Sequence, residues 1–214
     1  MTQPREIRWF PERRATGTAV KFQQVYYVLD TEFRILWVGG EWDEFALANS
    51  GANARSNEVL ATSLMAHVAD QTTRDVLARV ITAVIDAQKP LRIDYRCDSS
   101  TMLRRFQMTV QPMKEGRVLL VHDLRDAKSF ARPHVPWQHD KTASDFKCSF
   151  CNSVRLQGAE HWVAPENLDI EHPERVAYSI CEPCEGRVTE VIEALGEGRH
   201  PSRTSTAGFG PDQQ

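Results

Sequence analysis

The sequence lacks several features that would assign a function directly. None of its 214 residues belong to an apolar run of about 18, so the sequence offers no candidate membrane span. Residues 1–8 lack the apolar core of a secretory signal, and a reducing cytoplasm is therefore the expected location. We find no Gly-rich phosphate loop, kinase signature, Gly-x-Ser-x-Gly element or His-Glu-x-x-His motif. The sequence therefore favours a soluble protein that is not an enzyme.

An excess of charge of either sign is also absent. The formal net charge is −3, and the content of 41% hydrophobic and 26% charged residues is typical of a folded protein. No cluster of Lys and Arg is interleaved with aromatic residues, and residues 147–195 contain four basic against nine acidic side chains. Phosphate would be repelled by such a surface, so nucleic-acid binding is not expected.

The length of the chain suits one ordinary domain and one smaller module. Residues 127–146 are rich in Pro, His and polar side chains and show no sustained periodicity, which indicates a linker. The expected organisation is an N-terminal arm, a first module, the linker, a second module and a flexible tail, at residues 1–20, 21–126, 127–146, 147–195 and 196–214.

The first module shows two strand patterns, then helical patterns, then three further strand patterns. Residues 72–87 repeat apolar side chains at one helical turn and predict the longest helix of this module, after shorter helices at 42–49 and 59–67. The expected strands cover 25–29, 34–38, 91–97, 106–111 and 118–121. This order predicts an α+β fold, a five-stranded antiparallel sheet with helices on one face, in which the last three strands return beside the first hairpin.

Two motifs of this module resemble those of a bacterial type of PAS sensory domain. The first is a Trp-x-x-Phe-Ala-x-x-Asn element, and the second is Arg-Cys-Asp followed by Arg-Arg; they are matched by Trp42, Phe45, Ala46 and Asn49, and by Arg96, Cys97, Asp98, Arg104 and Arg105. The sequence departs from the family at residues 99–101, where a proline usually follows the Asp. The resemblance implies a domain that binds a small molecule between helices and sheet, or that forms a homodimer. It does not identify a PAS ligand.

Several single residues have a functional and a structural interpretation. His67 is a candidate haem ligand. Cys97 lies in an expected strand and therefore does not match the reactive cysteine of a flavin photoreceptor, which lies on a helix. Both residues are better interpreted as ordinary core or surface residues. Aromatic side chains that could line a pocket, but more simply form core, are Trp37, Trp42, Phe45 and Tyr95. The alternation of Arg96, Arg104 and Arg105 favours a solvated or interface face over an anion site.

The most specific pattern is a pair of Cys-x-x-Cys motifs in the second module. Cys148 and Cys151 are separated by 29 residues from Cys181 and Cys184. Four thiolates in two tight turns suit tetrahedral Zn²⁺, and a module of fewer than 50 residues needs such a cross-link. Pro183 and the apolar residues after it predict a helix that begins at the second pair. The module resembles treble-clef or ribbon-type zinc domains, and His134, His139 and His161 are not needed as ligands.

The leading functional hypothesis is a cytoplasmic sensory or adaptor protein. Its PAS-like module would recognise a ligand or partner, and its zinc module would serve another signalling protein as an interaction surface. The first alternative is a redox- or metal-responsive regulator whose zinc thiolates are the sensor. A DNA-binding regulator is the second alternative, and an iron–sulfur cluster in place of structural zinc is also chemically open.

Overall fold

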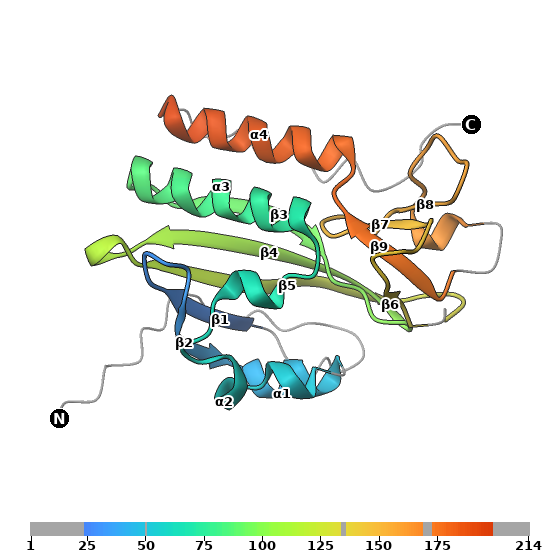
Figure 1. The fold of residues 1–214 in the computed structure, drawn as a ribbon, viewed down its shortest axis with the longest axis horizontal. Helices are drawn as coiled ribbons and strands as arrows, with labels where there is room; N and C mark the ends of the chain where they lie inside the picture. Colours follow the sequence, from blue (N-terminus) through green and yellow to red (C-terminus); the bar gives the residue numbers. More distant parts are fainter. Residues whose placement is uncertain (1–23, 50, 134–135, 169–172, 199–214) are drawn as a thin grey trace.

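The computed structural model describes residues 24–49, 51–133, 136–168 and 173–198 of the chain (Figure 1). The N-terminal arm expected at 1–20 lies outside these residues, as does the expected tail from residue 199 onward. None of the helices within the described ranges combines the length and the apolar character that crossing a membrane requires.

A five-stranded antiparallel sheet forms the centre of the first module, as the sequence predicts. Its strands lie in the order β2-β1-β5-β4-β3, so that the meander of the last three strands returns beside the opening hairpin. The strands are β1 (Gln24–Leu29), β2 (Ile35–Gly40), β3 (Leu91–Arg96), β4 (Met102–Pro112) and β5 (Val118–Ser129). β5 extends to Ser129, into the range predicted as linker, because its pairing with β4 continues to Met102.

Helices cover one face of this sheet and close the first core. They are α1 (Trp42–Ala48), α2 (Ser56–Val59) and α3 (Gln71–Ala87), with short 3₁₀ turns η1 (Ala52–Ala54), η2 (Leu64–His67) and η3 (Lys114–Gly116). The Asp70 side chain caps α3 by accepting a hydrogen bond from the Thr73 amide at 2.8 Å. Gln88 ends the helix in a left-handed conformation, two residues before Pro90. Alternate strand residues face the helices, and the shared core includes Leu29, Val80, Ile81, Val110 and Leu120.

The single helix predicted over residues 59–67 is wrong. The chain forms α2 and η2 there, and Ala61 between them has a positive φ of 63°. The backbone groups of this segment pair with the edge of β2: the Ala61 amide donates to the Ile35 carbonyl, and the Ile35 amide donates to the Thr62 carbonyl. Edge pairing therefore replaces the hydrogen bonds that a continuous helix would have made.

The second module packs against the end of the sheet and along α3. A four-stranded sheet has the order β6-β9-β7-β8, and α4 lies beside α3 in Figure 1. Its elements are β6 (Gln138–His139), β7 (Phe146–Cys148), β8 (Val154–Arg155), the 3₁₀ turn η4 (Pro165–Asn167), β9 (Arg175–Ser179) and α4 (Glu182–Gly196). Val188 and Leu195 of α4 belong to the same hydrophobic cluster as the α3 side chains, so the core continues from the sheet through α3 to α4.

Candidate metal centre

The four cysteines of the two Cys-x-x-Cys pairs form one buried cluster. The sulfur atoms of Cys148, Cys151, Cys181 and Cys184 all lie within 4.8 Å of one another, and no disulfide joins them. Sulfur atoms around a tetrahedral Zn²⁺ are about 3.8 Å apart, since each Zn–S bond is about 2.3 Å long. The Cys151 and Cys181 sulfurs are 3.6 Å apart. The donor set and its spacing therefore fit a metal ion such as zinc.

Parallel strands bring the two pairs together. β7 and β9 are neighbours, and Cys148 at the end of β7 lies opposite Ser179, two residues before Cys181. Asn152 has a φ of 63°, and its amide donates to the Cys148 carbonyl at 3.0 Å, which closes the turn of the first pair. Cys181 is the N-cap residue of α4, and Cys184 lies in the first turn of that helix, as the sequence predicts. A helix N-terminus favours a thiolate there.

Hydrogen-bond donors surround the sulfur atoms. The backbone amides of Phe150 and Cys181 each donate to the Cys148 sulfur at 3.4 Å. The Arg187 guanidinium donates to the Cys184 sulfur at 2.9 Å. These donors stabilise the thiolate form that a metal requires, and the Arg187 charge offsets part of the charge of about −2 that Zn²⁺ and four thiolates carry.

The cluster is suited to holding a metal rather than to metal-catalysed chemistry. Four sulfur ligands complete a tetrahedron and leave no position for water or substrate. His139 and His161 are not part of the cluster, while His134 lies outside the described residues. All four cysteines are buried, so oxidants reach their sulfur atoms poorly.

Aromatic side chains fill the space between helices and sheet in the first module. Ring centroids lie between 5.4 and 6.0 Å apart along a chain of contacts that joins Trp42, Tyr27, His122, Tyr95, Phe106 and Phe45. Of the aromatic residues that the sequence offers for a pocket, Trp42, Phe45 and Tyr95 thus belong to one cluster.

Trp37, the remaining pocket candidate, is instead 56% exposed on the edge strand β2. Simple strand alternation would place it on the same face as the buried Ile35. The pairing of β1 with β2 is irregular at this point, because Leu29 pairs with Ile35 while Val28 pairs with Trp37. The extra residue in β2 turns the Trp37 side chain to the outer face.

His122 is the histidine within this aromatic cluster, and the sequence gives it little weight as a functional residue. The Tyr95 hydroxyl lies 2.8 Å from its Nδ1, and the ring stacks on Tyr27. The sequence signal that could have revealed it is strand alternation, since His122 follows the buried Val118 and Leu120 at every second position of β5. His67, the candidate haem ligand, lies on the surface with its Nε2 2.6 Å from the Thr62 hydroxyl.

We expect His122 to make the protein sensitive to acid. Burial lowers its pKa to about 4 in the folded state, against about 6.5 in an unfolded chain. Between these values the unfolded chain binds a proton that the folded protein does not, so stability is lost as the pH falls through this window. The loss from about pH 7 to about pH 5 should be about 2 kcal/mol.

Urea unfolding of His122→Gln at both pH values measures this contribution. The variant should lose about 2 kcal/mol less than the parent on acidification, whereas His67→Gln, at the exposed site, should behave as the parent does. An equal loss in the parent and in His122→Gln would show that His122 does not cause the acid sensitivity.

The sequence predicts a solvated or interface face for the three arginines, and the solvated alternative is wrong for Arg96 and Arg104. Arg96 and Arg104 are 2% and 4% exposed. Arg96 pairs with Asp98 at 2.6 Å and with Glu166 at 3.0 Å. Arg104 donates to the Asn49 side chain at 2.7 Å and to the Cys97 carbonyl, so it joins the two motifs that carry the PAS resemblance. Strand alternation alone cannot reveal Glu166 and Asn49 as partners, because these two residues come from distant segments.

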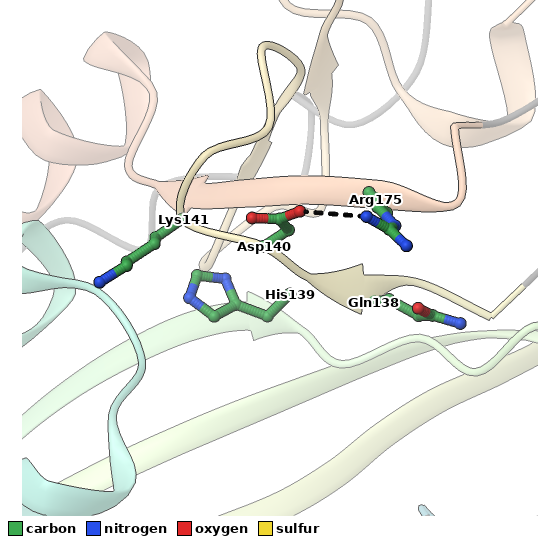
Figure 2. A pocket seen from close by; sticks show the side chains of 5 residues that line it. All are labelled: Gln138, His139, Asp140, Lys141 and Arg175. Atoms are coloured by element: carbon green, nitrogen blue, oxygen red, sulfur yellow. Dashed lines mark ion pairs between the residues drawn. The ribbon is translucent and has the colours of Figure 1, made fainter.

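A shallow hollow of about 330 Å³ lies on the second module (Figure 2). Its lining consists of Gln138, His139, Asp140, Lys141 and Arg175, on β6, on the residues after it and on β9. Asp140 and Arg175 form an ion pair of 3.6 Å. Both signs of charge are present and the hollow is open, so we assign no ligand to it.

Comparison with known proteins gives no match: no family model fits the chain, and no curated protein sequence is significantly similar to it.

Proposed function

We propose that this protein is a sensory or adaptor protein of the PAS type with a structural zinc site. It acts by contacting another signalling protein in the cytoplasm. The observation that carries the proposal is the cluster of four buried cysteine sulfurs within 4.8 Å of one another, at the junction of the two modules. Such a site supplies stability and a fixed arrangement of segments rather than a reaction.

The strand order and the joined motifs support the PAS assignment. The order β2-β1-β5-β4-β3 agrees with the sheet that the strand and helix patterns of the sequence predict, and such a sheet is compatible with a PAS-like domain. The hydrogen bond from Arg104 to Asn49 connects one residue of each motif, so both motifs contribute to the packing of the same domain. The aromatic side chains between helices and sheet pack on one another, which favours partner recognition over ligand binding.

Features of the surface also favour a protein partner. Leu36 and Trp37 are exposed on the edge strand β2, and exposed aromatic residues are enriched in protein interfaces. A homodimer through the PAS-like module belongs to the same proposal. The acidic second module, with a further charge of about −2 from a zinc–thiolate centre, disfavours the alternative of a DNA-binding regulator.

Native mass spectrometry with elemental analysis is the direct test of this function. Freshly purified, reduced protein should carry one zinc ion per chain, and the same spectrum reports the subunit number and any bound cofactor. Protein that is folded through residue 198 and holds no metal would refute the proposal. Detection of iron and sulfide instead of zinc would show that the four cysteines hold an iron–sulfur cluster.

Mild peroxide treatment distinguishes a purely structural zinc site from the alternative of a redox sensor. We expect the zinc to stay bound, because the four sulfurs are buried and the Cys184 sulfur accepts a hydrogen bond from Arg187. Zinc release can be followed with a chromogenic chelator, using fully denatured protein as the control for complete release. Stoichiometric release at peroxide levels that leave the protein soluble would favour the sensor.

A further inference from the structure

The two residues between the first pair of cysteines connect the metal centre to the first module. The Thr73 hydroxyl donates to the Ser149 hydroxyl at 2.9 Å, and the Ser149 hydroxyl donates to Asp70 at 3.3 Å. The other oxygen of Asp70 caps α3. The next residue, Phe150, accepts a hydrogen bond of 2.6 Å from the Arg96 amide at the end of β3. The turn that presents two metal ligands is thus also the docking element.

The second pair of cysteines fixes the position of α4. Cys181 and Cys184 lie at the N-terminal end of this helix, and its Val188 and Leu195 are buried in the shared core. The direct polar contacts between α4 and α3 are weak by comparison. Arg79 reaches Thr189 at 3.1 Å and Glu185 at 4.0 Å, and both contacts lie at the surface, where such pairs contribute less than about 1 kcal/mol.

Without an ion, the second module is held by short strands, by the apolar side chains of α4 and by the Arg96–Glu166 ion pair. Its strands β7 and β8 contain three and two residues, and a lone helix of 15 residues is marginal in water. The five-stranded sheet, in contrast, has longer strands, and residues of β1, β4, β5 and α3 make up the larger part of the shared hydrophobic core. The two parts should therefore respond differently to metal loss.

We propose that metal occupancy of the four-cysteine centre acts as a clamp: it docks the Ser149–Phe150 turn on α3 and β3, and it holds α4 over α3. Metal release then frees residues 147–198 and uncovers α3, while the five-stranded sheet stays folded. This inference rests on the proposed function, since it assigns a regulatory consequence to the same zinc site.

Hydrogen–deuterium exchange of the full chain, with and without chelator under reducing conditions, tests the clamp. Elemental analysis of the same samples reports how much metal remains. After metal removal, amide exchange should rise by about tenfold or more in α4, in the Ser149–Phe150 turn and in the first turn of α3, and should stay nearly unchanged in β1, β4 and β5. Continued protection of α4 in metal-free protein would overturn the clamp. Equal loss of protection in β4 and β5 would also overturn it, because the whole protein would then be one cooperative unit.

A pair of threonine variants tests the docking turn while the metal is in place. Thr73→Val removes the hydrogen bond to Ser149, and Thr72→Val, on the exposed side of the same turn, is the matched control. Thr73→Val should speed exchange in the turn and in the start of α3 at an unchanged zinc content. Exchange identical to that of Thr72→Val would refute the role of this contact. A lack of zinc in the parent protein would refute the proposed function instead, so the two failures are distinguishable.

Discussion

Replacing Cys151 by serine is expected to reduce the zinc content of the purified protein from one ion per chain to nearly none, and to unfold residues 147–198. A serine hydroxyl is a poor ligand for zinc, and three cysteines leave the tetrahedron incomplete. Structural zinc sites contribute roughly 10–16 kcal/mol of apparent binding free energy, which is also folding free energy for the segments that they join. Elemental analysis and limited proteolysis measure the two effects. We expect the largest effect of any single substitution here, since all four ligands are buried.

Cys97→Ala is the matched control for this experiment. Cys97 is the one cysteine outside the cluster, and its sulfur lies 3.9 Å from the Arg104 guanidinium. The variant should retain one zinc ion per chain and resist proteolysis at residues 147–198 as the parent does. If Cys151→Ser also retained stoichiometric zinc and an intact second module, four-cysteine coordination would be wrong.

Local patterns in the sequence were sufficient to predict most elements of the first module and the cluster of four cysteines. The apolar repeat over residues 72–87 predicts α3, which spans Gln71–Ala87, because a helix under a sheet needs a continuous apolar stripe. The spacing of the four cysteines predicts their cluster, since only a shared ion or disulfides explain two such pairs in so small a module. In both cases the signal depends on residues close in sequence or on a distinctive chemistry.

Contacts between distant segments could not be predicted in this way. The stripe on α3 includes Leu77 and Ile85 beside the residues that face the sheet, and nothing in the sequence indicates that α4 packs on the same helix. The burial of Arg104 likewise depends on Asn49, which is 55 residues away. Charged side chains are usually exposed, so an interpretation from composition places them on the surface unless their partners are known.

The substitution Arg96→Met is expected to lower the free energy of unfolding by about 3–5 kcal/mol. Arg96 is 2% exposed and lies between the Asp98 and Glu166 carboxylates, the first only 1% exposed. Methionine fills a similar volume but leaves the Asp98 charge buried, with the Arg104 amide at 2.9 Å as a neutral hydrogen-bond donor. The cost therefore comes mainly from an uncompensated buried charge, and urea unfolding of the zinc-loaded protein measures it.

Two further variants separate this charge effect from the loss of a long side chain. Arg92→Met, on the exposed face of the same strand, should change the unfolding free energy by no more than about 0.5 kcal/mol. Adding Asp98→Asn to Arg96→Met should recover part of the loss, because a neutral amide then replaces the buried carboxylate. Glu166 belongs to the second module, so the ion pair that crosses between modules contributes to their docking as well as to stability. If Arg96→Met were no more destabilising than Arg92→Met, the Arg96 ion pairs would contribute nothing to the stability of the fold. The docking of the second module would then depend on the turn at Ser149–Phe150 and on α4 alone.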